Sequence, residues 1–168
     1  MAEKRISPED QLATFLAKFT PEIEALAKTI LAKMRKRYPT ALELVYDNYN
    51  ALAIGFGPTE RPSEAIFSIA LFPRWVSLFF LQGAGLPDPE KKLKGSGNVA
   101  KHIRLPSVAT LDEPPVLALM HQAVVSSAIS FDPQGKRRLI IKSISAKQRP
   151  RRPAANTPRA RNGKARKG

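Results

Sequence analysis

Apolar residues in the first part of the chain recur every three or four positions, the spacing of one face of an α-helix. Two helices are predicted there, each opened by a capping residue and a proline, at Ser7-Pro8 and Thr20-Pro21. The second helix ends before Pro39, which disfavours helical backbone in the preceding residue. Its last turns are basic, which suits the partial negative charge of a helix C-terminus, through Lys33, Arg35, Lys36 and Arg37.

From residue 41 onward the spacing changes to the alternation and short apolar runs of β-strands. Turn residues separate these runs, as at Asp47-Asn48-Tyr49-Asn50 and Pro73-Arg74. A short helical turn at 90–93 precedes the fifth strand, and a third helix that starts at Asp112-Glu113-Pro114-Pro115 precedes the sixth. The predicted strands are 42–46, 51–56, 65–72, 75–81, 99–105 and 138–144.

The segment 65–86 is almost wholly apolar and is long enough to span a bilayer, for which about 20 residues suffice. Arg74 lies at its centre, where a charged side chain costs roughly 2.5–3.5 kcal/mol in a membrane helix. Its β-branched and aromatic residues favour strands. We therefore interpret the segment as two buried strands joined by a turn, with no membrane contact. The first residues lack the apolar core of a secretory signal peptide, so we expect a cytoplasmic protein.

The order of elements predicts an α+β fold, a two-layer sandwich in which helices pack mainly on one face of an antiparallel sheet of five to six strands. The strands 65–72 and 75–81 carry large apolar residues on both alternating sets, so we expect them in the middle of the sheet. If they expose an apolar face opposite the helices, either a second copy of the chain in a homodimer or the strand 138–144 must cover that face.

Charge divides the 168-residue chain into two parts, a domain at 1–145 and a tail at 146–168. The whole chain has 28 Lys and Arg against 14 Asp and Glu, a net charge of +14. Residues 1–135 hold 15 basic and 14 acidic residues, whereas residues 136–168 hold 13 basic residues and no acidic one. The tail has no large apolar residue, so we expect it to be disordered.

A disordered polycation attracts polyanions such as nucleic acid through counterion release, without sequence preference. No aromatic residue interleaves the tail to stack bases, so a tail that serves solubility and binds polyanions only at low salt is the alternative. The predicted polyanion-binding residues are Lys147, Arg149, Arg151, Arg152, Arg159, Arg161, Lys164, Arg166 and Lys167.

A second candidate site combines aromatic and polar residues at the turns. If the two turns lie at the same end of the sheet, they bring together Tyr46, Asn48, Tyr49, Asn50, Arg74 and Trp75. His102, in the fifth strand, is a further ligand-binding candidate. In the alternative interpretation, Tyr46 and Trp75 pack the rim of the core and the asparagines form the turn.

Composition argues against an enzyme. The chain has no cysteine, which excludes disulfides, thiolate nucleophiles and cysteine-ligated metals. Its two histidines, His102 and His121, lie on different elements without a nearby acid pair. The glycines of 94–98 lack the spacing of a phosphate-binding loop, so we interpret this segment as a connection. We therefore predict no catalytic residue, no metal ligand and no cofactor.

Several motifs occur in one order through roughly residues 20–130. They are Val45-Tyr46-Asp47, Trp75-Val76-Ser77-Leu78-Phe79-Phe80, Gly83-Ala84-Gly85-Leu86-Pro87-Asp88-Pro89, Leu93-Lys94-Gly95-Ser96-Gly97 and Lys101-His102-Ile103-Arg104. Together they resemble the YdhG-like family of bacterial domains of unknown function. The resemblance implies a compact two-layer α/β domain with helices against one face of an antiparallel sheet. Where members commonly have a histidine before the Val-Ser-Leu strand, this chain has Trp75.

For relatives of this kind the resemblance also implies a frataxin-like role in iron binding and delivery. Such a role needs an exposed cluster of carboxylate ligands. The acidic residues of this chain are scattered singly or in cap pairs such as Glu9-Asp10. We therefore expect a non-enzymatic binding or adaptor module with a polyanion-binding tail, and we keep the iron-delivery role as the alternative.

Overall fold

Six strands form one open sheet in the order β5-β4-β3-β2-β1-β6 in the computed structural model, which describes residues 5–154. Neighbouring strands are antiparallel except β1 and β6, which are parallel. The strands are β1 (Leu42–Asp47), β2 (Leu52–Gly57), β3 (Phe67–Leu71), β4 (Val76–Phe80), β5 (Lys101–Arg104) and β6 (Arg138–Ile144). The predicted α+β class and strand order along the chain are confirmed, and the sheet is antiparallel except at the β1–β6 edge.

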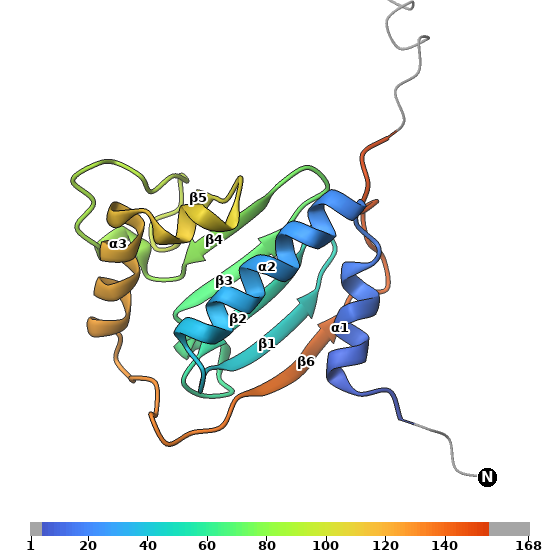
Figure 1. Cartoon of the computed structure of the whole chain (residues 1–168), viewed down its shortest axis with the longest axis horizontal. Coiled ribbons are helices and arrows are strands. Elements are labelled where there is room, and N and C mark those ends of the chain that lie inside the picture. The colour runs from blue at the N-terminus through green and yellow to red at the C-terminus, as the bar shows by residue number, and fades with distance from the viewer. Residues whose placement is uncertain (1–4, 155–168) are drawn as a thin grey trace, which may run out of the picture.

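The helices α1 (Pro8–Leu16), α2 (Pro21–Arg37) and α3 (Pro114–Val125) lie on one side of the sheet, as Figure 1 shows. The Ser7 hydroxyl accepts a hydrogen bond from the amide of Asp10, and the Thr20 hydroxyl accepts one from the amide of Ile23. These bonds satisfy amides that have no partner within the helix, so α1 and α2 begin where their capping residues predict.

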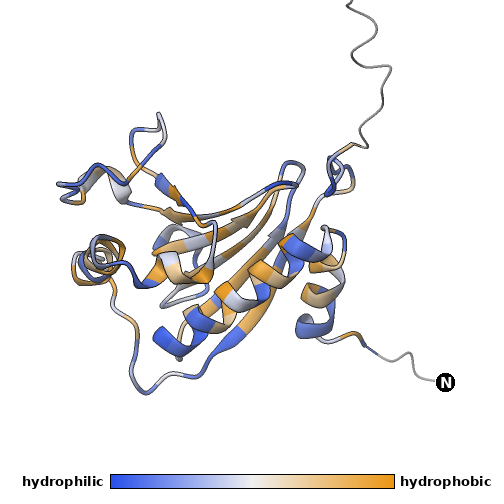
Figure 2. Cartoon of the chain, turned by 45° about the horizontal axis from the view of Figure 1, so that its top comes forward, coloured by the Kyte–Doolittle hydropathy of each residue, from blue (hydrophilic) through white to orange (hydrophobic). Residues whose placement is uncertain are grey.

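The core lies between the helices and the sheet. Figure 2 shows hydrophobic residues concentrated on the strands and on the sides of the helices that meet them. Its fully buried large side chains include Phe19, Ile30 and Met34 from the helix layer and Ile54 and Phe67 from the sheet. The long apolar segment forms two strands, β3 and β4, as predicted. Each of them has a hydrogen-bonded neighbour strand on both sides.

One local prediction is wrong, and one of two alternatives is excluded. The chain at 90–93 forms no helical turn, because the Asp88 carboxylate accepts hydrogen bonds from the amides of Lys92 and Leu93, and Lys91 has a positive φ of 55°. The last strand covers no face of the sheet. The chain instead passes through α3 in the helix layer and adds β6 to the free edge of β1. Two parallel strands need such a long crossover connection.

The basic end of α2 holds the layers together. Lys33 and Arg37 both donate to the Asp112 carboxylate, and Arg35 forms two bonds with Glu43 in β1. These side chains therefore have partners within the fold. No helix in the described part of the chain is long and apolar enough to cross a membrane.

Candidate functional site

Four connections lie at one end of the sheet, one of them after β5, whose last residue Arg104 pairs with Ser77. The β1–β2 turn follows Asp47, which pairs with Leu52, and the β3–β4 turn follows Leu71, which pairs with both Leu52 and Val76. The segment after β6 starts at the same end, because Ile144 also pairs with Asp47. We call this the anchored end of the sheet.

A cavity of about 660 Å³ lies between the β1–β2 turn, the β3–β4 turn and the segment after β6. Arg74 and the aromatic side chains of Phe72 and Trp75 line it from the sheet. Arg149 and Arg152 line it from the segment. The cavity therefore combines three guanidinium groups with two aromatic side chains.

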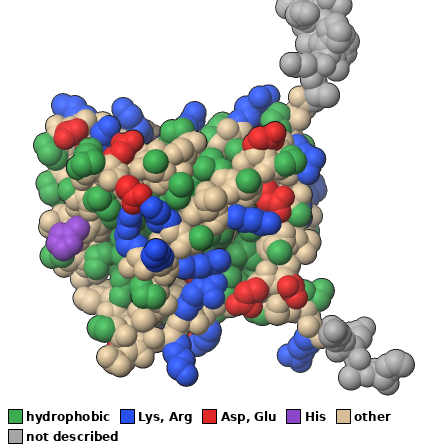
Figure 3. Space-filling view, in the orientation of Figure 1, with side chains coloured by type: hydrophobic (Ala, Val, Ile, Leu, Met, Phe, Trp, Pro, Cys, Tyr) green, Lys and Arg blue, Asp and Glu red, His purple; other side chains and the backbone are tan. Residues whose placement is uncertain are grey.

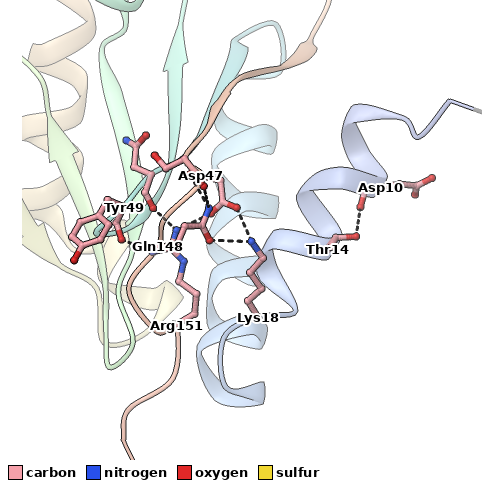
Figure 4. Close-up of polar contacts among 9 residues, drawn as sticks. Asp10, Thr14, Lys18, Asp47, Tyr49, Gln148 and Arg151 are labelled. Atoms are coloured by element: carbon pink, nitrogen blue, oxygen red, sulfur yellow. Dashed lines mark hydrogen bonds and ion pairs between the residues drawn. The ribbon is translucent and has the colours of Figure 1, made fainter.

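A buried ion-pair cluster attaches this segment to the domain (Figure 4). Arg151 donates from Nη2 to Asp47 Oδ1 at 2.8 Å, and Lys18 donates from Nζ to Asp47 Oδ2 at 2.8 Å. The side chains of Asp47 and Arg151 are 0% and 4% exposed. Burial alone raises the pKa of the Asp47 carboxyl, but hydrogen bonds from Lys18, Gln148 and Arg151 outweigh it and hold that pKa below its usual range.

Backbone groups complete the attachment. The Arg151 Nη2 atom also donates to the carbonyl of Asn48 at 2.6 Å, and the amide of Arg149 donates to the carbonyl of Tyr49 at 2.9 Å. Arg152 donates from Nε to the carbonyl of Lys18 at 3.2 Å. The segment is therefore tied both to the β1–β2 turn and to the end of the first helical region.

These contacts correct the prediction for the tail. Disorder from residue 146 onward is wrong for 146–154, because ion pairs and backbone hydrogen bonds offset the ordering entropy that apolar burial does not. Arg151 is wrong as a polyanion-binding residue, because its guanidinium is buried against Asp47. Lys147, Arg149 and Arg152 are exposed. The remaining predicted residues, Arg159, Arg161, Lys164, Arg166 and Lys167, lie outside the described residues.

The predicted turn residues take different roles around the cavity. The Asn50 side chain lines it and accepts a hydrogen bond from Arg149 Nη1 at 3.5 Å. Asn48 and Tyr49 bind the segment through backbone carbonyls, and the Tyr49 side chain is 51% exposed. Arg74 is exposed, so its charge faces solvent at the cavity. The two turns therefore meet, as their placement at one sheet end predicts.

Trp75 is half-buried in a stacked row on the sheet face that carries no helix. Its ring stacks on Phe72 with centroids 5.1 Å apart, and the Arg104 guanidinium lies 4.4 Å from its ring centroid. Sequence reasoning missed Phe72 and Arg104. The signal for Phe72 is its place directly across the Pro73-Arg74 turn from Trp75, whereas Arg104 is brought in by pairing of β5 with β4.

Tyr46 and His102 lie outside this cavity. Tyr46 is half-buried on β1, and its hydroxyl is buried without a hydrogen-bond partner among the described residues. Burial raises the pKa of Tyr46. His102 packs on Phe79 with ring centroids 5.0 Å apart, and burial, with the charge of Arg104, lowers the pKa of His102. The structure thus separates these two residues from the turn residues.

A second cavity of about 430 Å³ lies at the opposite end of the sheet, beside the C-terminus of α3. Phe80, Leu86 and Ile129 line it, and its one acidic side chain, Glu64, accepts a hydrogen bond from Thr59. No Lys or Arg lines this cavity among the described residues. Within residues 5–154, no three His, Asp or Glu side chains come close enough to hold a metal ion.

No family model matches the chain, and neither the curated proteins nor the solved structures contain a match to it. Membership of the YdhG-like family therefore stays a prediction that rests on the ordered motifs of the sequence.

Proposed function

We propose that this protein is a non-enzymatic binding or adaptor module that takes a polyanion, nucleic acid, at the anchored end of its sheet. The cavity that brings Arg74, Arg149 and Arg152 around Phe72 and Trp75 carries this proposal. Guanidinium groups bind phosphate oxygens in a bidentate geometry, and aromatic rings contact bases. The segment after β6 thus places two ordered arginines beside aromatic rings of the sheet. The tail has no aromatic ring of its own.

The charges of the three arginines are not neutralised by acidic partners among the described residues. None of them forms an ion pair with an acidic residue in the described part of the chain. The helix layer differs, because Figure 3 shows its Lys and Arg side chains interspersed with Asp, Glu and hydrophobic ones. There Lys33 and Arg37 share Asp112. The anchored end is therefore better suited to a polyanion than the helix layer.

The chain contains one tryptophan, Trp75, so its fluorescence reports directly on this cavity. We expect a single-stranded oligonucleotide to change that fluorescence and to bind more weakly as salt rises. Each phosphate contact contributes a slope of about −0.7 in the logarithm of affinity against the logarithm of salt for single strands. Arg74→Ala should therefore weaken binding of all sequences alike and reduce the slope by about 0.7.

Arg61→Ala is the matched control, because Arg61 is an exposed arginine in the loop after β2, at the opposite end of the sheet. It should leave affinity and slope unchanged. The proposal is overturned if no oligonucleotide alters Trp75 fluorescence, or if Arg74→Ala weakens binding no more than Arg61→Ala does. Binding through the residues outside 5–154 alone would give the second result, with affinity unchanged in both variants.

A further inference from the structure

The sheet face opposite the helices carries two rows of side chains that run across the strands. Cross-strand pairing aligns one row as Tyr46, Ala53, Ala70, Ser77 and Arg104. The neighbouring row is Leu44, Gly55, Ser68, Phe79 and His102. All three helices lie on the other side, so no helix covers these rows (Figure 1). We call the surface with these two rows the helix-free face.

Small residues occupy the middle of both rows, and rings stand beside them. In the first row the side chains between Tyr46 and Arg104 are short, because they belong to Ala53, Ala70 and Ser77. The β5 side of the face carries two ring contacts, Trp75 with Arg104 and Phe79 with His102. Leu44 is fully buried and Ala65 packs against Gly55, so the accessible part of this face is its β5 side, where Phe79 and His102 are half-buried and Arg104 is exposed. Trp75 joins this part of the face to the cavity that it lines.

The charge on this face favours an anion. The strands β1 to β6 contain two acidic residues, Glu43 and Asp47, and both alternate with the row positions, so they point toward the helices. Arg104 is exposed on the face. The rows thus present a cation and no carboxylate. Burial and the charge of Arg104 lower the pKa of His102, which favours the neutral ring and suits it to stacking.

The spacing of the flat groups separates single strands from duplexes. Arg104 and His102 are two residues apart on β5, which is about 7 Å along a strand. Successive bases in a duplex rise about 3.4 Å. Adjacent bases can contact both groups only if they are unstacked from each other, as in single strands that splay their bases onto aromatic rings and guanidinium planes.

We propose that an unpaired nucleic-acid strand runs from the cavity at the anchored end across the helix-free face, with bases on the Trp75–Arg104 and Phe79–His102 contacts. This proposal rests on the proposed function, because the phosphates of the same strand bind the arginines at the cavity. It adds the class of nucleic acid, which is single-stranded. A duplex can bind the arginines through its phosphates, but its stacked bases cannot contact both ring pairs.

The test compares one mixed-sequence strand of about 12 nucleotides, within the usual site size, with the same strand annealed to its complement. Titration of the full chain, followed by Trp75 fluorescence, should show tighter binding of the single strand. Phe79→Leu and His102→Leu should each weaken single-strand binding by about tenfold and leave duplex binding unchanged.

Phe131→Leu and His121→Leu are the matched controls. Phe131 is a half-buried ring packed on Tyr38, away from the helix-free face, and His121 is exposed on α3. Neither control should change affinity. Thermal melting monitored by circular dichroism checks that each variant folds, and His102→Leu alone decides the matter if Phe79→Leu does not fold.

Three outcomes overturn the inference. The first is equal binding of single strand and duplex. The second is unchanged single-strand affinity in a folded His102→Leu chain. The third is a dimer in sedimentation that Phe79→Leu dissociates, which would assign the face to a second copy of the chain. All three can occur while Arg74→Ala still weakens binding, so they are distinct from failure of the proposed function, in which nothing changes Trp75 fluorescence.

Discussion

Two buried carboxylates of β1, four residues apart, hold the edge strand β6 and its flanks in different ways. Glu43 and Asp47 are both 0% exposed and face the helices. Glu43 pairs with Arg35 from α2 and with Arg137 just before β6. Asp47 pairs with Lys18 from the helix layer and with Arg151 after β6. Each end of β6 is therefore fixed by one acid of its neighbour.

The two clusters differ in how far their arginines are buried. The Arg35 and Arg137 side chains are 32% and 29% exposed, whereas the Arg151 side chain is 4% exposed. The arginines of the Glu43 cluster reach solvent, and none of its three residues lines the cavity at the anchored end. The Asp47 cluster lies beneath the segment that brings Arg149 and Arg152 to the cavity. Similar ion pairs thus fix the start of β6 at the Glu43 end and position the candidate site at the Asp47 end.

Loss of the Asp47 carboxylate should have the largest effect. Asp47→Ala leaves Arg151 buried without its acid, and breaking a buried pair in this way costs about 3–5 kcal/mol of unfolding free energy. Urea denaturation measures this loss. The variant should also bind single strands more weakly, because the segment with Arg149 and Arg152 loses its attachment. Asp132→Ala, in an exposed turn, is the control, and a loss below about 1 kcal/mol in Asp47→Ala would contradict the prediction.

Glu43→Gln should have a smaller effect. Its two arginines can turn toward solvent, so the cost is that of lost charged hydrogen bonds, about 1.5–3 kcal/mol. Oligonucleotide affinity, measured by Trp75 fluorescence, should remain unchanged because Glu43 lies at the other end of β1. Weaker binding in this variant would show that the two clusters are not independent.

Arg35→Lys should destabilise the fold by about 1 kcal/mol. Arg35 donates from Nε and Nη2 to the two Glu43 oxygens at 2.9 and 2.8 Å, a bidentate geometry that a lysine cannot form. The charge is kept, so the change isolates the geometry of the Glu43 cluster. Chemical denaturation of the variant and the unsubstituted chain at the same pH measures the difference, and equal stability would disprove the bidentate contribution.

The smallest expected effect is the acid dependence of the Asp47 cluster, because burial opposes the ion pairs that lower the pKa of Asp47. The folded-state pKa lies below the unfolded value, so this stability is present above about pH 4 and is lost as pH falls through the folded pKa. The protection of the Arg149 and Ser145 amides, which bond to this turn region, should fall on acidification when their hydrogen exchange is compared with that of an unstructured peptide at the same pH. Asp47→Asn should remove that acid-dependent loss of protection, and its persistence would assign it to another group.

Local signals located most elements but not the parallel edge. Ser7 and Thr20 cap helices within their own neighbourhood, so their positions were readable from the sequence. The pairing of β6 with β1 joins residues about 96 positions apart, since Leu42 pairs with Arg138, and no local pattern encodes such a partner. Asp88 shows the same limit, because its carboxylate replaced the helical hydrogen bonds expected at 90–93.

The candidate site was partly readable as well. Asn50, Arg74 and Trp75 could be placed together because hairpin turns on neighbouring antiparallel strands alternate between sheet ends in a regular way. The sequence predicts Asp47 in a turn. Asp47 lies two residues after the buried Val45, however, so it is on the same, core-facing side of β1. Its partner Arg151 had no signal, because a basic residue in a stretch without apolar neighbours resembles a solvated tail.

The sequence by itself determined the helices, the six strands, the buried character of β3 and β4 and the concentration of positive charge in the last part of the chain. These properties depend on periodicity, capping and composition, which act over a few residues. The tertiary structure alone decided which charges are used by the fold and which remain free. Arg151 is neutralised by Asp47 and Arg149 lines the cavity, because the pairing of β6 with β1 brings 145–154 against the turns.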